Sequence, residues 1–183
     1  LVPHRVPKYE PTNIHEVLER VRSLLLAESP AGLSKDKTIT VRRDYDTSLP
    51  ELIGDREKLI QAVLNIARNA AQAMQASGQS NGEIILRTRA ERQVTLAKKR
   101  YRVAIKLQII DNGPGIPTEI RDRIFYPLVS GREGGSGLGL TLAQTFITQH
   151  HGMVECESEP GRTCFTILLP IESSLMQGQA IKQ

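Results

Sequence analysis

Residues 101 to 110 constrain the fold most, because apolar or aromatic side chains occupy every odd position of this stretch. Alternate side chains of a β-strand point to opposite faces, so the odd positions are predicted to face a common core. Asp111 continues this parity, which aims its carboxylate toward the interior at the end of the strand. A buried charge without a partner is costly, so this position requires a donor. The alternative is an Asx-turn within the loop that follows.

Apolar periodicity predicts the remaining elements and leads to an α/β fold. Helices are expected from Asn13 to about Glu28, for about 22 residues after Asp55, in a short piece opened by Pro117, and from Gly139 to His151. Strands are expected at 38–43, 83–90, 153–158 and 163–169. Because no steady βαβ rhythm appears, we predict a two-layer sandwich in which three helices cover one face of a mixed β-sheet.

The length of 183 residues suits one domain. Residues 1–11 contain three prolines and are interpreted as a linker from an upstream segment outside this sequence. Residues 12–171 are predicted to form the domain. Residues 172–183 are polar and are predicted to be a disordered tail.

Composition excludes several classes of protein. Aromatic residues make up 4% of the chain, too few for a groove that stacks sugars or single-stranded nucleic acid. The net charge of +4 is scattered, which argues against direct nucleic-acid binding. The chain contains neither a long apolar run nor a signal-like start, so we expect a cytoplasmic protein without a membrane span.

The helix after Asp55 carries a polar sector beside its apolar stripe. Asn competes with the backbone for hydrogen bonds, so two Asn residues four positions apart on a half-buried face need a reason. An amide oxygen can ligate Mg²⁺ without adding negative charge beside a triphosphate. The alternative is a solvated polar flank. The sector contains Gln61, Asn65, Arg68, Asn69 and Gln72.

Five of the nine residues from Gly131 to Gly139 are glycine, and a predicted helix follows. A helix start offers free N–H groups and the positive end of the helix dipole, which suit a phosphate. The stretch matches neither a P-loop nor a dinucleotide-binding fingerprint. The alternative is a flexible surface loop.

Thr163 shares parity with the apolar residues of the last predicted strand. Its hydroxyl can therefore reach the same pocket as Asp111. The alternative is a buried threonine whose hydroxyl bonds to the backbone.

The order of these motifs resembles the ATP-binding domain of sensor histidine kinases. This Bergerat-type fold is shared with gyrase, the ninety-kilodalton heat-shock ATPases and the mismatch-repair ATPases, and the resemblance covers residues 12–171. Residues 43–50 and 125–135 are similar to nitrogen-regulation sensor kinases. The motifs are Asn65-Ile66-Ala67-Arg68-Asn69-Ala70, Asp111-Asn112-Gly113-Pro114-Gly115, Ile124-Phe125-Tyr126-Pro127, Gly135-Ser136-Gly137-Leu138-Gly139-Leu140 and Gly161-Arg162-Thr163-Cys164-Phe165.

The resemblance implies ATP and Mg²⁺ as cofactors. It implies that Asp111 accepts the adenine amino group, with Gly115 against the base and Thr163 acting through water. It also implies that Asn69 ligates Mg²⁺, with Asn65 supporting the site. The further nucleotide-binding residues that it implies are Gly113, Arg132, Gly135, Gly137, Leu138 and Gly139.

The sequence departs from the family pattern in two places. Leu128 follows Pro127 where relatives usually have Phe, and Gln72 stands where many relatives carry Lys or Arg. No histidine of the chain lies in a phosphoacceptor motif, so the resemblance implies that the acceptor is upstream and that this chain holds no catalytic residue of its own.

The implied function is that of a protein-histidine kinase, which donates the γ-phosphoryl group to a histidine on a separate domain in nitrogen regulation. The implied partners are that upstream dimerisation domain, a response regulator of the NtrC type and the PII signalling protein. We expect a monomeric fragment of a dimeric protein. Two alternatives remain: an ATP-hydrolysing conformational switch, and a non-catalytic nucleotide-sensing or PII-docking module. Asn65 argues against the switch, because such ATPases place a Glu general base there and an amide cannot accept a proton.

Overall fold

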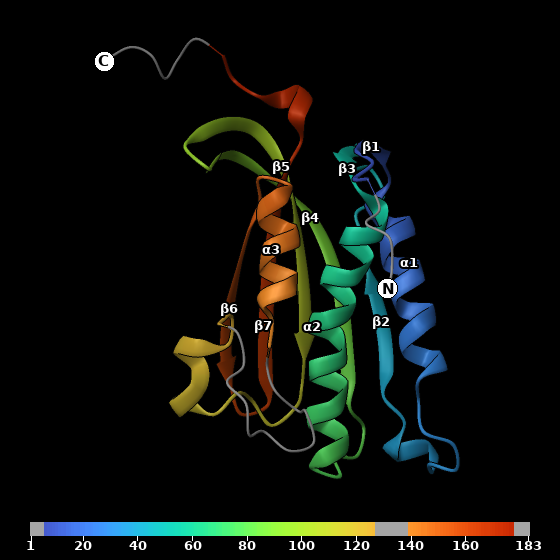
Figure 1. The fold of residues 1–183 in the computed structure, drawn as a ribbon. Coiled ribbons are helices and arrows are strands. Elements are labelled where there is room, and N and C mark those ends of the chain that lie inside the picture. The colour runs from blue at the N-terminus through green and yellow to red at the C-terminus, as the bar shows by residue number, and fades with distance from the viewer. Residues whose placement is uncertain (1–5, 127–138, 178–183) are drawn as a thin grey trace.

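A five-stranded sheet forms one layer of the molecule and three helices form the other (Figure 1). The computed structural model describes residues 6–126 and 139–177. The helices are α1 (Ile14–Ala27), α2 (Arg56–Ala76) and α3 (Thr141–Gln149). In sheet order the strands are β2 (Thr40–Asp44), β4 (Glu83–Leu96), β5 (Lys99–Asp111), β7 (Arg162–Pro170) and β6 (Met153–Glu159).

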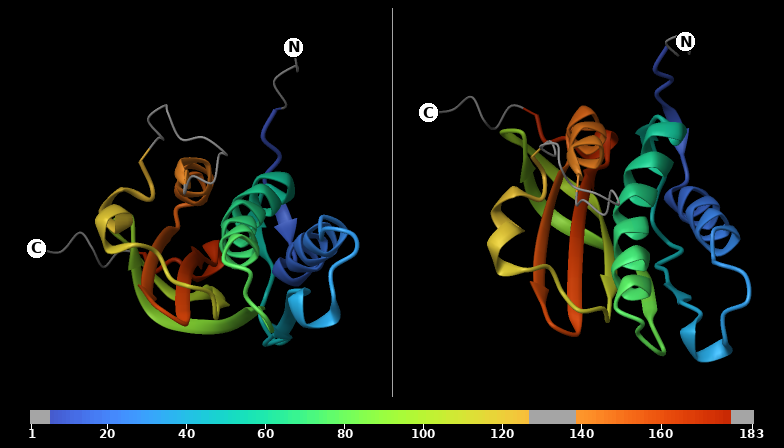
Figure 2. Two further views of the ribbon diagram at one scale, coloured as in Figure 1. Left: turned by 90° about the horizontal axis from the view of Figure 1, so that it is seen from below. Right: turned by 60° about the horizontal axis from the view of Figure 1, so that its bottom comes forward.

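The sheet is mixed, because β2 runs parallel to β4 while the other neighbours are antiparallel. All three helices lie on the same side of the curved sheet (Figure 2). The predicted two-layer fold is therefore confirmed. Between the layers lies one apolar core, to which β5 contributes Ile105, Leu107 and Ile109, each at most 1% exposed.

Polar side chains fix where the first two helices begin. Asn13 accepts a hydrogen bond from the N–H of His15 at 2.8 Å, and Asp55 accepts from Glu57 at 3.1 Å and Lys58 at 3.3 Å. Both side chains satisfy backbone donors that have no partner inside the helix. Both N-caps were predicted, and α2 has 21 residues where about 22 were expected.

Two short strands were not predicted from the sequence. β1 (Glu10–Thr12) pairs antiparallel with β3 (Leu52–Gly54) beside the start of α2. The backbone N–H of Lys8 also donates to Oδ2 of Asp55 at 3.2 Å. Residues 8–12 thus pack against the domain, although most of them belong to the segment that we interpreted as a linker.

The helix α3 is shorter than the sequence predicts. It ends at Gln149, and the backbone of His151 is left-handed with a φ of +63°. The ring of His150 turns back to the start of α2, where Nε2 accepts from the N–H of Asp55 at 2.9 Å. Its Nδ1 donates to the carbonyl of Phe146 at 2.8 Å. Burial lowers the pKa of His150, and these two bonds tie the end of α3 to α2.

The β4–β5 ribbon extends well past the strand end that we expected at residue 90. It turns only at Ala97 and Lys98, both with positive φ. A second small apolar cluster forms there, in which Tyr101 is 3% exposed and Leu175 packs against the buried residues. The N–H of Met176 donates to the carbonyl of Arg100 at 2.8 Å. Residues 172–177, which we expected to belong to a disordered tail, therefore lie against this ribbon.

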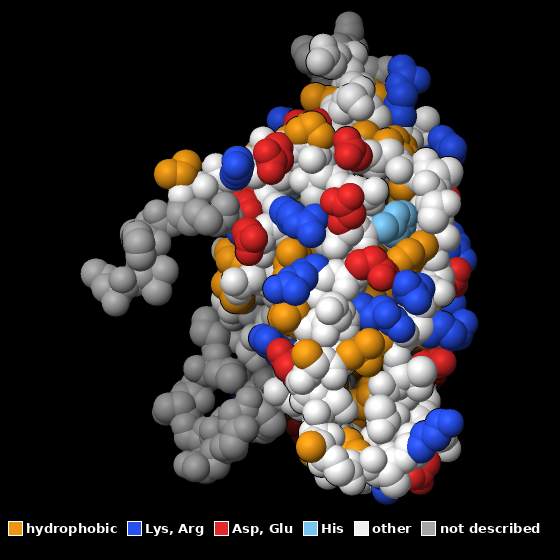
Figure 3. Space-filling model, turned by 90° about the vertical axis from the view of Figure 1, so that its right-hand side faces the viewer, with side chains coloured by type: hydrophobic (Ala, Val, Ile, Leu, Met, Phe, Trp, Pro, Cys, Tyr) orange, Lys and Arg blue, Asp and Glu red, His pale blue; other side chains and the backbone are white. Residues whose placement is uncertain are grey.

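Charges of both signs intermingle on the face that carries α1 and β2 (Figure 3). Arg43 pairs with Glu19 at 3.1 Å and Arg56 with Glu16 at 3.2 Å, so α1 is linked to β2 and to α2. Exposed pairs of this kind contribute little to stability. This face carries no single-sign stripe of the kind that binds nucleic acid.

No helix in the described ranges is both long enough and apolar enough to cross a membrane.

Candidate functional site

A cavity of about 230 Å³ opens between α2, the loop after β5 and the start of β7. Four residues predicted to bind nucleotide line it together: Asn69, Asp111, Gly115 and Thr163. Its apolar walls come from α2, the loop, η2 (Thr118–Arg123) and β7, and they include Ala73, Ile116, Ile120 and Phe165. The cavity thus combines apolar walls with a small set of polar groups, which is the usual character of a small-molecule site.

Asp111 is the last residue of β5 and lines the cavity on the core side of the sheet, which is the side that its odd position predicts. The residue is 7% exposed, and its Oδ1 accepts a hydrogen bond from the N–H of Gly113 at 2.8 Å. The Asx-turn that we kept as an alternative is therefore present, and the same residue also lines the cavity. Burial raises the pKa of Asp111, and the Gly113 bond partly opposes this rise.

The glycines after Asp111 allow the backbone of a second turn to approach closely. A Cβ atom at Gly115, whose φ is +89°, would lie 2.9 Å from the carbonyl oxygen of Glu159. The N–H of Gly161 donates to the carbonyl of Gly113 at 2.9 Å. Glycine is required at position 115 both by its backbone angle and by this contact. The β6–β7 turn thereby holds the loop against the cavity.

Thr163 stands directly beside Asp111 in the sheet, because the two are register partners on β7 and β5. Its hydroxyl lies 2.7 Å from Oγ of Ser158, so its partner is a side chain and not the backbone. Ser158 was not identified from the sequence. The signal that would have found it is its position opposite Thr163 on β6, which only the strand pairing reveals.

The two asparagines of α2 form a connected pair. Nδ2 of Asn69 donates to the backbone carbonyl of Asn65 at 3.0 Å, which leaves the side-chain oxygen of Asn69 as its acceptor for a ligand. Oδ1 of Asn65 is buried and has no hydrogen-bond partner among the described residues. A buried acceptor without a partner is costly, so this atom is suited to a bound cation or water.

Asn69 lines the cavity and offers an amide oxygen of the kind that Mg²⁺ accepts as a ligand, whereas Asn65 is not among the residues that line it. Mg²⁺ takes oxygen ligands and commonly uses only one or two protein groups besides phosphates and water. The described residues contain no cluster of three or more His, Cys, Asp or Glu side chains that could hold a metal ion unaided.

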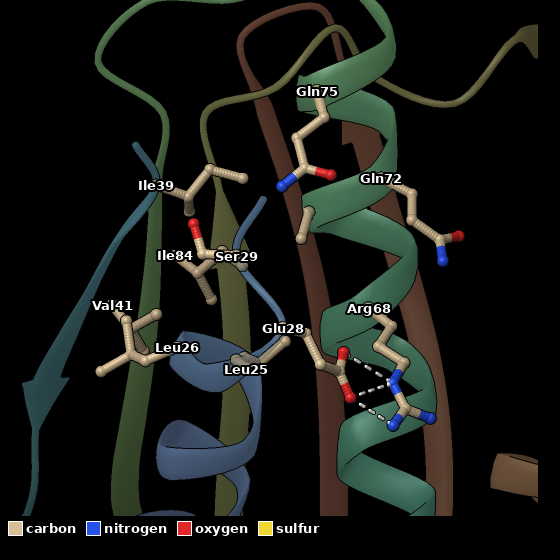
Figure 4. Close-up of a pocket in the computed structure, with 11 residues that line it drawn as sticks. Leu25, Leu26, Glu28, Ser29, Ile39, Val41, Arg68, Gln72, Gln75 and Ile84 are labelled. Atoms are coloured by element: carbon tan, nitrogen blue, oxygen red, sulfur yellow. Dashed lines mark hydrogen bonds and ion pairs between the residues drawn. The ribbon is translucent and has the colours of Figure 1, made fainter. Parts of the chain in front are cut away.

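Three residues of the polar sector predicted on α2, Arg68, Asn69 and Gln72, line two cavities, whereas Gln61 and Asn65 line neither of them. Arg68 turns toward α1, where its Nε donates to Oε1 of Glu28 at 3.0 Å (Figure 4). This pair lies at a second, smaller cavity of about 110 Å³, whose lining includes Ile39 and Ile84. Gln72 lines both cavities, so it marks the ridge between them. Of the motif from Asn65 to Ala70, Asn69 and Ala70 line the larger cavity.

The glycine-rich segment is described only at its end. Arg132, Gly135, Gly137 and Leu138 lie outside the described residues, and Gly139 immediately precedes the N-cap of α3. Beside the larger cavity, the ring of Phe125 meets that of Phe165 edge to face at 6.3 Å.

Known proteins are similar to this chain in sequence and in fold. The NtrB protein of Vibrio alginolyticus, named a sensory histidine kinase/phosphatase, is 48% identical over 171 residues, which are 93% of this chain and 47% of the relative. The nucleotide-free catalytic domain of histidine kinase ThkA matches with a TM-score of 0.68 at 21% identity, over 90% of this chain and 96% of that domain. ThkA in complex with the response regulator protein TrrA gives a TM-score of 0.65 at 20% identity, over 92% of this chain and 43% of that one.

The chain spans about half the length of the NtrB relatives. A family model described as histidine kinase-, DNA gyrase B-, and HSP90-like ATPase matches residues 54–173. This range runs from the end of β3 past the end of β7 and includes every described side chain that lines the larger cavity. The chain therefore belongs to the family of histidine kinase-, DNA gyrase B- and HSP90-like ATPases.

Proposed function

We propose that this chain binds Mg-ATP and presents the γ-phosphoryl group to a histidine on a separate domain, as the catalytic part of a two-component kinase in nitrogen regulation. The observation that carries the proposal is the buried carboxylate of Asp111, which lines one cavity with Asn69, Gly115 and Thr163. The 48% identity to a kinase/phosphatase named NtrB supports the nitrogen-regulation role.

At the base end of the cavity, Asp111 would accept a hydrogen bond from the adenine amino group. Gly115 would lie against the base, and Thr163 would reach it through water. The walls formed by Ala73, Ile120 and Phe165 suit the apolar faces of a purine. Gly113 supports this arrangement by holding the carboxylate in place.

At the phosphate end, Asn69 would hold Mg²⁺ through its side-chain oxygen, with Asn65 one turn earlier behind it. The cation would neutralise charge on the phosphates during transfer. The phosphates would also be bound by residues of the glycine-rich segment, as the family resemblance implies: Arg132, Gly135, Gly137, Leu138 and Gly139.

The reaction itself breaks the bond from the γ-phosphorus to its bridging oxygen and forms a bond to an imidazole nitrogen. The chain contributes binding and orientation, which is where phosphoryl transfer gains most of its rate. The acceptor is proposed to lie upstream. Hydrogen bonds occupy the rings of two described histidines, which supports an acceptor elsewhere. Nε2 of His15 bonds to the hydroxyl of Thr88 at 2.8 Å, and both ring nitrogens of His150 are hydrogen-bonded.

The structure of ThkA with the response regulator protein TrrA supports a response regulator as a partner, and the family resemblance implies one of the NtrC type. We also propose the His-bearing dimerisation domain upstream and the PII signalling protein, a cytoplasmic location, and a monomeric fragment of a dimeric protein. In this proposal residues 1–11 lead in from the upstream domain and residues 12–171 form the ATP-binding domain.

Phosphoryl transfer in trans tests the proposal. The chain is mixed with Mg²⁺, γ-labelled ATP and the His-bearing part of the NtrB relative that this chain does not span. The expected result is label on a histidine of that part, and none without the chain. Rapid release of labelled phosphate in the absence of any acceptor would contradict the kinase and favour an ATP-hydrolysing switch. A chain that binds PII but does not bind ATP would favour the non-catalytic PII-docking module.

A further inference from the structure

The linker segment, residues 8–12, is held on the domain at one corner, beside the start of α2. β1 pairs with β3, and both strands lie next to the first turn of α2 (Figure 1). The N–H of Lys8 donates to Oδ2 of Asp55 at 3.2 Å. The ring of Tyr9 packs against that of His150, with the ring centroids 5.2 Å apart. His150, which directly follows α3, therefore joins the linker segment, the start of α2 and the end of α3.

The hydrogen bonds of His150 require a neutral ring. Its Nε2 lies 2.9 Å from the backbone nitrogen of Asp55, and because a backbone N–H can only donate, Nε2 must accept. The ring proton is then on Nδ1, which donates to the carbonyl of Phe146 at 2.8 Å. A protonated ring carries a second proton on Nε2, so that two N–H groups would face each other. Protonation of His150 therefore breaks its bond to Asp55.

The surroundings of His150 give a protonated ring little room and little water. The residue is 5% exposed, and a Cβ atom at Gly54 would lie 3.2 Å from its Cδ2, so the ring packs directly on the end of β3. Burial disfavours the charged form of an imidazole. A charged His150 is therefore accommodated only when the linker segment moves away and admits water to the ring.

The charges around His150 do not reverse this preference. Burial is the largest influence and lowers its pKa, and the ammonium of Lys58 on α2 and the neighbouring His151 act in the same direction. The carboxylate of Asp55 and the bond to the carbonyl of Phe146 oppose them, with smaller effect. From the linker segment the ring of Tyr9 faces the imidazole. The docked ring is therefore neutral at a pH where a free histidine begins to bind a proton.

We infer that His150 is a pH-sensitive latch: its neutral ring holds the linker segment on the domain, and its protonated ring releases it. The released ring titrates near the ordinary value of 6.5 and the docked ring at a lower pH. The hold is therefore complete above pH 6.5 and is lost as the pH falls below it. None of the residues in these contacts lines the larger cavity. Only one consequence rests on the proposed function, which is that release changes where the upstream acceptor domain can lie.

The test is amide hydrogen exchange of β1, β3 and Asp55 between pH 5 and pH 8, with each rate divided by the intrinsic rate at that pH. In the wild-type chain, protection of these amides is expected to fall by up to about tenfold per pH unit below 6.5, while the amides of β5 stay protected. His150→Gln offers an acceptor oxygen to Asp55 and does not titrate, so its protection should not depend on pH. The control His151→Asn, which suits the left-handed backbone at this position, should behave like the wild type.

Protection that is independent of pH in the wild type, or an equal pH dependence in His150→Gln, overturns the inference. A parallel loss of protection in β5 also overturns it, because the whole domain would then unfold. Titration of the His150 ring followed by NMR needs only the wild-type chain, so it decides the matter even if His150→Gln does not fold: a pKa at or above 6.5 contradicts the latch. Calorimetric titration of Mg-ATP at pH 8 tests the proposed function separately. Absence of ATP binding would overturn that function and leave the latch in place.

Discussion

Among single residues, Asp111 places a carboxylate in the larger cavity, and the burial of this charge lowers the stability of the fold. Asp111 is nearly buried, and among the described residues its carboxylate accepts one hydrogen bond, from the N–H of Gly113. Burial raises its pKa above the ordinary value of 3.8. A neutral side chain of the same shape would avoid this cost of desolvation. Binding sites often sacrifice stability in this way, because the group needed for the ligand is a poor group for folding.

Asp111→Asn is therefore expected to stabilise the chain at pH 8 by roughly 0.5–2 kcal/mol. Asn keeps an oxygen for the N–H of Gly113 and carries no charge. Because the folded protein raises the pKa of Asp111, the stability from its protonated form is present below 3.8 and is lost as the pH rises through the folded value. Denaturant unfolding from pH 4 to pH 8 should show the advantage of the variant growing with pH. The exposed Asp122→Asn serves as the control. A variant that is less stable than wild type at pH 8 would contradict this account.

The role proposed for Asn69 predicts how ATP binding depends on Mg²⁺. If its side-chain oxygen holds Mg²⁺, removing the metal with a chelator weakens ATP binding to the wild-type chain on the order of tenfold. In Asn69→Ala the affinity for ATP should be low and nearly independent of Mg²⁺. Gln72→Ala, which changes a residue lining the same cavity, should keep the metal dependence. Full metal dependence in Asn69→Ala would show that Asn69 is not the ligand.

Among the helices and strands, local sequence patterns were sufficient to predict the three helices and β5. The apolar stripe and Asp55 located α2, and the alternation from residue 101 located β5 and its inward face. β1 and β3 escaped notice because each has three residues, too few for a periodicity. The length of the β4–β5 ribbon was also missed, because its apolar cover comes partly from Leu175, far along the chain.

The cap of α2 allows a direct test of this element. Oδ1 of Asp55 accepts from two N–H groups of α2, and Oδ2 accepts from the N–H of Lys8. Asp55→Ala removes these acceptors and is expected to lower the free energy of unfolding by about 2 kcal/mol, the upper end for an N-cap. Asp55→Asn retains one acceptor oxygen and should lose clearly less. Equal losses in the two variants, measured by denaturant unfolding, would mean that capping is not what Asp55 provides.

At the scale of the whole molecule, the sheet brings together residues that are distant in the sequence. The order of the motifs pointed to the family, and parity placed Asp111 and Thr163 on one face. The pairing of β6 with β7 brings Ser158 to Thr163, and the packing of α1 on α2 turns Arg68 to Glu28. Neither contact has a signal within its own stretch of chain, because each depends on which elements become neighbours. Four residues that line the larger cavity, Asn69, Asp111, Gly115 and Thr163, were therefore identified from the sequence, but the contacts that support them were not.

In the proposed function, the adenine of ATP binds in the larger cavity through Asp111. Calorimetric titration of Mg-ATP into the wild-type chain and into Asp111→Asn at one pH measures this contact. Asn presents an amide where adenine needs a carboxylate oxygen, and thermal unfolding can establish that the variant is folded. The account predicts binding by the wild type and a loss of affinity of about tenfold or more in the variant. Equal affinity in the two proteins, or no binding by the wild type, would contradict it.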